Sequence, residues 1–195
     1  MYRDIRICFV GDSMVAGIGD EQALGWPGRL CAAANLAGEA ISYYNLGVRR
    51  NTSADILARW QSECTPRLPK GSDNRIVFCC GVNDATFENG ALRVEPEQSV
   101  ANVKAMLTGA ADYPTLFVGP PPIANAEQNE RIAALSHAYE GVCNELGVPF
   151  IELFSPLVDD ALIAQQAKAF DGSHPRQYGF EKMAKVIAES GKWWF

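Results

Sequence analysis

The chain has 195 residues, of which 48% are hydrophobic and 21% charged, and this length and composition are typical of one globular domain over residues 1–195. Its net charge of −6 argues against a nucleic-acid partner, because such binding takes most of its affinity from cations held against phosphate. No apolar run approaches the roughly 18 residues of a membrane span. The six cysteines lack C-x-x-C spacing, so we expect reduced thiols and a cytoplasmic location. The first residues run directly into the first predicted strand, so we expect no export signal.

Short apolar segments alternate with amphipathic ones along the chain. In chain order, we expect strands at residues 5–10, 41–46, 75–80, 115–118 and 148–153, most of them followed by glycine. Helical periodicity predicts helices at residues 29–36, 53–60, 96–107, 127–146, 157–166 and 178–189. This alternation is typical of a three-layer α/β/α fold with a five-stranded parallel sheet. Right-handed crossovers then place the carboxyl ends of all strands at one edge.

Ser13 lies directly after the first predicted strand. The carboxyl edge of a parallel sheet is where α/β proteins bind ligands, since loops converge there and helix N-termini present their amides. A serine at this position either caps the following helix with its hydroxyl or acts as a nucleophile. A nucleophile also requires a base, a carboxylate that orients the base, and donors for an oxyanion. The rest of the chain therefore has to decide between the two roles.

The search for a base is short because the chain has only two histidines. His137 falls off the apolar stripe of its predicted helix and is expected to face solvent. His174 lies in a loop before the last predicted helix, three residues after Asp171. A turn through Gly172 can bring the Asp171 carboxylate to one imidazole nitrogen and leave the other free to accept a proton. A polar turn capped by Asp171 or Ser173 explains the same residues equally well.

Four motifs fall at the predicted carboxyl edge. They are Gly11-Asp12-Ser13-Met14, Gly47 after the second strand, Gly81-Val82-Asn83-Asp84 after the third, and Asp171-Gly172-Ser173-His174-Pro175 before the last helix. Read together, they resemble the sequence blocks of the GDSL or SGNH hydrolases, in the family's order and over nearly the whole chain. Met14 stands where the family most often has leucine, an apolar exchange with little expected effect. The resemblance implies the flavodoxin-like fold of the SGNH hydrolases.

By this resemblance the chain is a serine hydrolase with Ser13 as its nucleophile. His174 is then the general base and acid, and Asp171 orients it. The backbone N–H groups of Ser13 and Gly47 and the side-chain amide of Asn83 would form the oxyanion hole. Taken without the other motifs, Asn83 is explained equally well by an Asx turn. The implied reaction is a two-step acyl transfer that uses no cofactor and no metal.

Three residues in loops on the predicted catalytic edge can line an acyl or alcohol pocket: Trp26, Phe87 and Pro121. Packing within the protein is the alternative for each of them. The connecting loops are short, which favours an open groove and small or short-chain acyl groups. We therefore expect a small-molecule ester as substrate, followed by acyl-CoA thioesters or lysophospholipids and then acetylated carbohydrates. A flavodoxin-like binding module is the non-enzymatic alternative, and the sequence leaves the oligomeric state open.

Overall fold

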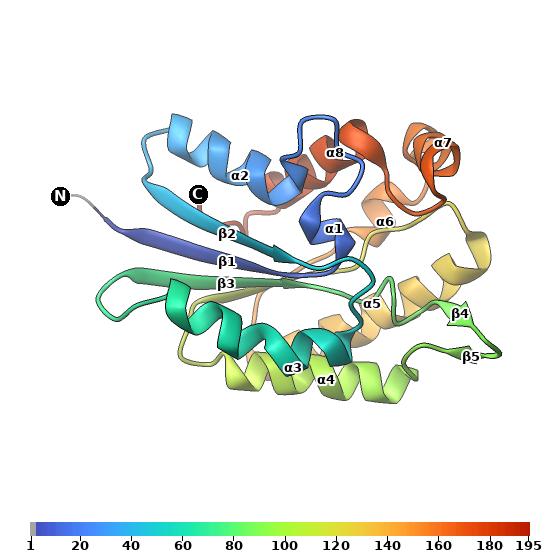
Figure 1. Cartoon of the computed structure of the whole chain (residues 1–195), viewed down its shortest axis with the longest axis horizontal. Helices are drawn as coiled ribbons and strands as arrows, with labels where there is room; N and C mark the ends of the chain where they lie inside the picture. The colour runs from blue at the N-terminus through green and yellow to red at the C-terminus, as the bar shows by residue number, and fades with distance from the viewer. Residues whose placement is uncertain (1–2) are drawn as a thin grey trace.

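Five parallel strands form one sheet in the computed structural model, which describes residues 3–195 (Figure 1). In the order β2-β1-β3-β6-β7, the strands are Ile41–Gly47, Ile5–Gly11, Asp73–Cys79, Thr115–Val118 and Phe150–Ile151. The register places Gly11 opposite both Gly47 and Cys79. The loops that follow β1, β2 and β3 therefore start side by side, which brings their residues to one edge of the sheet.

Helices cover both faces of the sheet and confirm the predicted three-layer fold. One face carries α2 (Gly25–Leu36) and α8 (Arg176–Glu189), and the other carries α3 (Ser53–Cys64), α4 (Pro96–Gly109) and α5 (Ala126–Leu146) (Figure 1). The short elements are α1 (Ser13–Ala16), a 3-10 turn at Thr65–Arg67, α6 (Phe154–Leu157) and α7 (Ala161–Phe170). Each face has its own apolar core, with Trp26 and Phe180 in one and Trp60 and Phe78 in the other. Burial of these large side chains fixes the helices to the sheet.

A small hairpin follows β3 in a segment where the sequence predicts no element. It consists of β4 (Phe87–Glu88) and β5 (Ala91–Leu92), which pair antiparallel. Its turn residues, Asn89 and Gly90, have φ angles of 55° and 85°. An Asn-Gly pair is the preferred sequence for a two-residue hairpin turn with two positive φ angles. The hairpin stands at the carboxyl edge, beside the loop after β2 (Figure 1).

Several element boundaries differ from the predicted ones. α2 begins at Gly25 rather than at residue 29, and β7 contains only two of the residues expected in the last strand. α7 begins at Ala161 rather than at residue 157. The cause of the second helix shift is the Asp160 carboxylate, which accepts hydrogen bonds from backbone N–H groups of the first turn and caps the helix there.

The C-terminal aromatic residues pack on the domain. Trp193 is 8% exposed, and its ring centroid lies 6.2 Å from that of Phe9 on β1. The guanidinium of Arg75 lies 4.9 Å from the ring centroid of Trp194 and 4.7 Å from that of Phe195. These cation–π contacts and the burial of Trp193 make the end of the chain part of the core beside β1 and β3.

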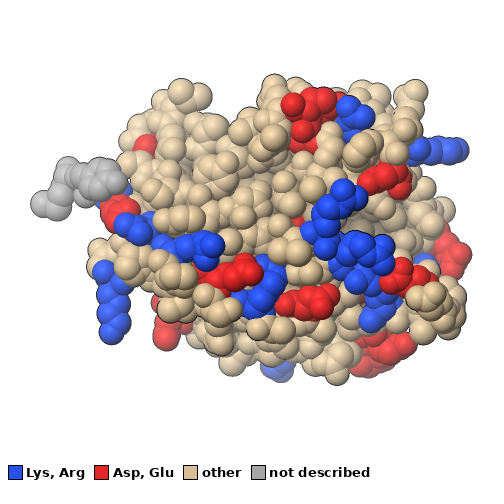
Figure 2. Space-filling model, in the orientation of Figure 1, with Lys and Arg blue, Asp and Glu red and all other residues tan. Residues whose placement is uncertain are grey.

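The surface carries charges of both signs. Figure 2 shows acidic and basic side chains close to one another over the lower and right-hand parts of the face in view, with a gathering of Lys and Arg near the carboxyl edge of the sheet. Among residues 3–195, no helix combines the length and the apolar character that a membrane crossing requires.

Candidate active site

Ser13 is the first residue of α1, where the chain leaves β1. Asp12 caps this helix, because its Oδ1 accepts a hydrogen bond from the Met14 N–H at 2.8 Å. A Cβ on Gly11 would meet the carbonyl oxygen of Cys79, so the turn into the helix has room only for glycine. The Ser13 hydroxyl forms no hydrogen bond among the described residues and is not the cap. Of the two roles that the sequence leaves open, capping is taken by Asp12.

Asp171 and His174 face each other across the turn between α7 and α8. Asp171 Oδ2 lies 2.6 Å from His174 Nδ1, and Oδ1 accepts hydrogen bonds from the backbone N–H groups of Ser173 and His174 at 3.0 and 2.9 Å. Burial acts to raise the pKa of Asp171, but the hydrogen bonds from His174 and Ser173 outweigh it and hold the pKa below its usual value. An ionised Asp171 favours the imidazole tautomer that carries its proton on Nδ1.

The second ring nitrogen of His174 is left without a partner. The imidazole is 6% exposed, and Nε2 is buried without a hydrogen-bond partner among the described residues. With Nδ1 protonated, Nε2 has a lone pair that can accept a proton. A catalytic hydrogen bond to this atom can be long in the free protein and tighten when substrate binds. His137 is exposed on α5, as the sequence predicts.

Packing brings the loop of His174 toward the loops after β1 and β6. Gly19, in the segment after α1, lies so close to α7 that a Cβ there would stand 2.6 Å from the ring of Phe170. On the other side, the N–H of Ala124 donates to the carbonyl oxygen of Gly172 at 3.0 Å. The segment 171–174 is thus held at the carboxyl edge of the sheet, which is the edge that carries Ser13.

Asn83 joins the first three loops of this edge. Its Nδ2 donates to Asp12 Oδ2 at 3.2 Å and to the carbonyl oxygen of Asn51 at 3.0 Å. The amide therefore lies beside the turn that carries Ser13, but both of its hydrogens are engaged. A hydrogen bond from Asn83 to a substrate requires one of these partners to be released.

Gly47 ends β2 and lies against the α1 turn. A Cβ at this position would stand 2.7 Å from the carbonyl oxygen of Asp12, so a larger residue does not fit. Its N–H donates to Asn45 Oδ1 at 3.0 Å and is not free. In the loop that follows, the N–H groups of Arg49 and Arg50 donate no hydrogen bond among the described residues, and Arg50 has a left-handed φ of 64°. The free donors of this loop thus belong to residues that no sequence motif marks.

Asp12 is a buried carboxyl group with an unusual proton affinity. Burial raises its pKa from 3.8 to about 7, against the lowering effect of the hydrogen bonds from Met14 and Asn83, and the nearby Asp84 adds to the rise. Asp84 is also fully buried, and it accepts hydrogen bonds from the Ser53 N–H and the Ser99 hydroxyl. Asp12 thus holds its own loop through the Met14 N–H, and Asp84 ties the loop after β3 to α3 and α4.

Asp12→Asn is expected to change how stability depends on pH. Because the pKa of Asp12 is raised on folding, its contribution to stability is complete below about pH 4 and is lost as the pH rises through about 7. Each pH unit in this window costs up to about 1.4 kcal/mol. Urea unfolding between pH 4 and 8 should show this decline in the wild type and a flatter curve in the variant. Parallel curves for the two proteins would contradict the raised pKa.

Of the three residues expected to line a pocket, two are buried and one is exposed. Trp26 is fully buried in α2, where its ring packs edge-on against Phe9 at 5.5 Å, so the expectation that it lines a substrate pocket is wrong. Pro121 is also buried, which removes its ring from an open pocket. Both serve packing, the alternative that the sequence leaves open. Phe87, on the β4–β5 hairpin, is 58% exposed and remains available to a substrate.

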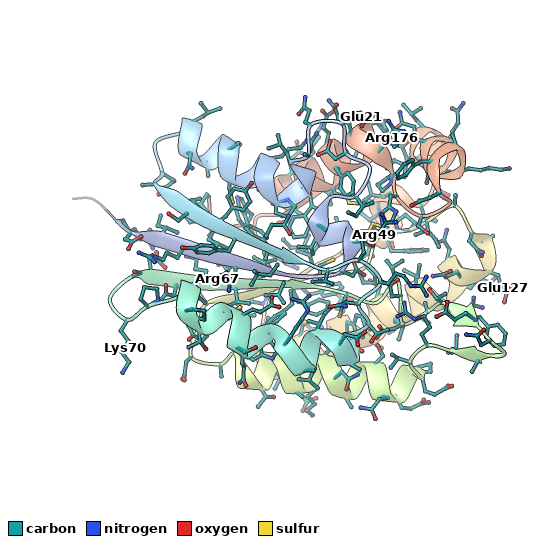
Figure 3. All side chains as sticks on the ribbon, viewed as in Figure 1. Glu21, Arg49, Arg67, Lys70, Glu127 and Arg176 are labelled. Atoms are coloured by element: carbon teal, nitrogen blue, oxygen red, sulfur yellow. The ribbon has the colours of Figure 1, made fainter. Side chains whose placement is uncertain are left out.

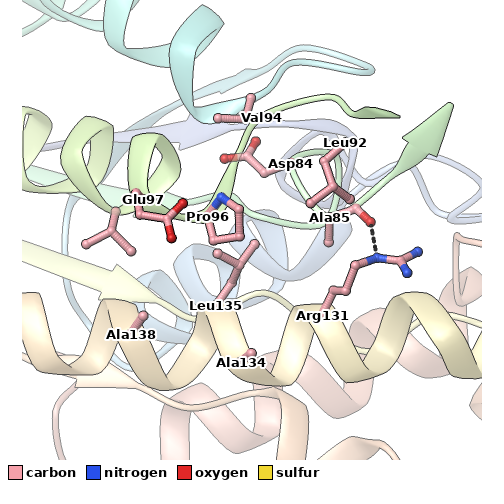
Figure 4. Close-up of a pocket in the computed structure, with 11 residues that line it drawn as sticks. Asp84, Ala85, Leu92, Val94, Pro96, Glu97, Arg131, Ala134, Leu135 and Ala138 are labelled. Atoms are coloured by element: carbon pink, nitrogen blue, oxygen red, sulfur yellow. Dashed lines mark hydrogen bonds between the residues drawn. The ribbon is translucent and has the colours of Figure 1, made fainter. Parts of the chain in front are cut away.

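An apolar groove of about 470 Å³ begins at Asp84 but belongs to another part of the surface (Figure 4). It runs under the hairpin between α4 and α5, and its walls include Val94, Val100 and Leu135. Neither Ser13 nor His174 lines it. No sequence motif marks this groove, because its walls come from three separate parts of the chain.

The model of the GDSL-like lipase/acylhydrolase family matches residues 9–182. No curated protein matches the sequence.

Several solved structures share the fold at low sequence identity. A lipase/acylhydrolase from Enterococcus faecalis is 22% identical, with a TM-score of 0.78 over 96% of this chain and 95% of that one. An acetylxylan esterase from Geobacillus stearothermophilus is 15% identical, with a TM-score of 0.74 over 95% and 93% of the two chains. The psychrotrophic esterase EstA from Pseudoalteromonas sp. is 18% identical, with a TM-score of 0.71 over 97% of each chain. At these identities the likeness shows a common fold.

Proposed function

Because the chain belongs to the GDSL-like lipase/acylhydrolase family and is a hydrolase of ester bonds, we propose that it cleaves carboxylic esters with small acyl groups through a covalent intermediate on Ser13. The observation that carries the proposal is the Asp171–His174 pair, with 2.6 Å between Oδ2 and Nδ1 and with Nε2 left free. The family match also favours this enzyme over the flavodoxin-like binding module.

In the proposed mechanism, Ser13 Oγ attacks the ester carbonyl while His174 Nε2 takes the hydroxyl proton. Asp171 stabilises the imidazolium that forms and keeps the ring in its orientation. The imidazolium then gives its proton to the leaving alcohol, and the acyl group stays on Ser13. Water releases the acyl group in a second step, with His174 again as base.

The proposed oxyanion hole uses donors from three loops. The Ser13 N–H and the Asn83 amide come from the loops after β1 and β3, and the Gly47 N–H comes from the loop after β2. Gly47 must exchange its hydrogen bond to Asn45 for one to the substrate, and Asn83 must likewise release a partner. The backbone N–H groups of Arg49 and Arg50, in the same loop as Gly47, donate no hydrogen bond among the described residues and need no such exchange.

The proposed preference for small acyl groups rests on the surroundings of Ser13. The loop after β2 is short, with residues 48–52 between the strand and α3. The apolar groove, which would suit a long acyl chain, does not contain Ser13 or His174. Acyl-CoA thioesters, lysophospholipids and acetylated carbohydrates are the competing substrates for the same site.

Hydrolysis of 4-nitrophenyl acetate, butyrate, octanoate and palmitate tests the proposed substrate class. We expect kcat/KM to be highest for acetate or butyrate and to fall at least about tenfold by octanoate, since longer chains gain no buried contact. A rise toward palmitate would refute the small acyl group. If none of the four esters is turned over, acyl-CoA and acetylated xylose become the next substrates to assay.

A further inference from the structure

Arginine side chains gather at the loop after β2. We define the arginine cluster as Arg49 and Arg50 in this loop and Arg93 after β5. Glu88 on β4 is the carboxylate that pairs with Arg50 and Arg93. Arg50 donates to both Glu88 oxygens at 2.9 and 3.0 Å, and Arg93 Nε lies 3.1 Å from the same carboxylate. Figure 2 shows Lys and Arg side chains gathered near this edge of the molecule.

The charges of the cluster do not cancel. The guanidinium groups of Arg50 and Arg93 share the Glu88 carboxylate, and Arg93 also helps to lower the pKa of Asp55, so three guanidinium groups face two carboxylates. Arg49 is exposed, and its guanidinium forms no ion pair or hydrogen bond among the described residues. In a protein of net charge −6, this edge therefore carries a local excess of positive charge, with Arg49 as its free group.

The loop that carries Arg49 is fixed against the proposed nucleophile. The N–H of Val48 donates to the carbonyl oxygen of Gly11 at 3.0 Å, and the carbonyl oxygen of Asn51 accepts from Asn83 Nδ2 at 3.0 Å. Arg49 lies between these two anchors, one on the strand that leads to Ser13 and one on a proposed oxyanion donor. Figure 3 labels Arg49 at the carboxyl edge of the sheet, beside this loop.

The hairpin holds the loop in an uncommon backbone conformation. Arg93 donates from a terminal guanidinium nitrogen to the carbonyl oxygen of Arg50 at 2.7 Å, and Arg50 keeps its left-handed φ of 64°. A residue other than glycine with a left-handed φ costs free energy, which contacts with the surrounding residues have to offset. The hydrogen bond from Arg93 therefore fixes the backbone of the loop at the residue that follows Arg49.

We propose that Arg49 binds an anionic group on the ester substrate, so that the site prefers esters carrying a carboxylate or a phosphate near the scissile bond. A guanidinium presents a planar set of donors that matches both groups. Arg49 has no counter-ion among the described residues, and its loop is anchored to the strand that leads to Ser13, so its guanidinium is available to an anionic group of a substrate. The inference rests on the proposed ester hydrolysis at Ser13 and adds the charge of the substrate to it.

The test compares three acetyl esters of the same ring. They are 4-acetoxybenzoate, its neutral methyl ester, and 4-acetoxyphenyl phosphate, each assayed for kcat/KM with the wild type and three variants. Arg49→Gln removes the free positive charge, and Glu88→Gln removes the carboxylate that pairs with Arg50 and Arg93. Lys70→Gln is the charge control, because Lys70 lies at the opposite end of the molecule (Figure 3).

We expect the wild type to prefer an anionic ester over the neutral one, and Arg49→Gln to lower that ratio about fivefold. Glu88→Gln should raise the ratio, Lys70→Gln should leave it unchanged, and added salt should reduce it in the wild type. The faster of the two anionic esters identifies the carboxylate or the phosphate as the bound group.

Two results would overturn the inference in different ways. If the wild type hydrolyses the neutral ester as well as the anionic ones, or if Arg49→Gln keeps the wild-type ratio, Arg49 does not bind the substrate and the proposed ester hydrolysis still stands. If Ser13→Ala hydrolyses these esters as fast as the wild type, the proposed function fails and the inference fails with it.

Discussion

Ser13→Ala is expected to lower kcat for short-chain 4-nitrophenyl esters by about a thousandfold or more, because the variant has no oxygen to form the acyl-enzyme. The hydroxyl of Ser13 forms no hydrogen bond among the described residues, and the cap of α1 is Asp12. Its removal should therefore leave the free energy of unfolding within about 0.5 kcal/mol of the wild type. Initial rates and urea unfolding of the same preparations measure the two effects separately.

Ser53→Ala is a matched control with the opposite expected result. Ser53 Oγ accepts a hydrogen bond from Asn102 Nδ2 at 2.9 Å and is fully buried, so its loss should reduce stability by about 1–3 kcal/mol. We expect this variant to retain most of its activity while folded. A Ser13→Ala protein that keeps wild-type rates, or that loses stability as Ser53→Ala does, would assign Ser13 a structural role in place of a chemical one.

The parts of the fold that the sequence predicts well are those fixed by local pattern. The strand at Thr115–Val118 is found at its predicted boundaries, because a short apolar run is stopped by Gly119 and the prolines that follow. The β4–β5 hairpin escaped prediction although Asn89-Gly90 is a strong turn sequence. Strands of two residues are too short to show the alternation by which a strand is recognised.

In the candidate site as well, the sequence predicts contacts between residues that are close in the chain better than contacts that depend on the fold. Asp171 and His174 are three residues apart, so one turn decides their contact and the sequence is enough to expect it. The N–H of Gly47 donates to Asn45 on the same strand, whereas the Asn83 amide meets Asp12 across 71 positions, where only the fold brings the two together. No motif records whether such an amide is free or engaged. The sequence places Trp26 in a loop on the catalytic edge, because the burial of its ring depends on the packing of α2 on β1.

Asp171→Asn should lower kcat about 10⁴-fold, the loss that follows when a catalytic histidine is held in the wrong tautomer. In the wild type, Oδ1 accepts two backbone N–H groups and Oδ2 faces His174 Nδ1. Asparagine can keep the first set with its carbonyl oxygen, which turns its amide nitrogen toward Nδ1. That nitrogen donates a hydrogen, so the ring proton moves to Nε2, and His174 can no longer accept the proton of Ser13.

Asp160→Asn provides the comparison for this prediction. Asp160 caps α7 at its other end and accepts from two backbone N–H groups and from the Tyr178 hydroxyl, but it does not contact His174. We expect this variant to lose stability without a comparable loss of kcat. The lowered pKa of Asp171 supplies a second readout: its contribution to stability is present at neutral pH and is lost as the pH falls through that pKa, so Asp171→Asn should flatten this acid decline. If Asp171→Asn reduces kcat no more than Asp160→Asn does, the carboxylate serves only the turn, and His174 functions without an orienting partner.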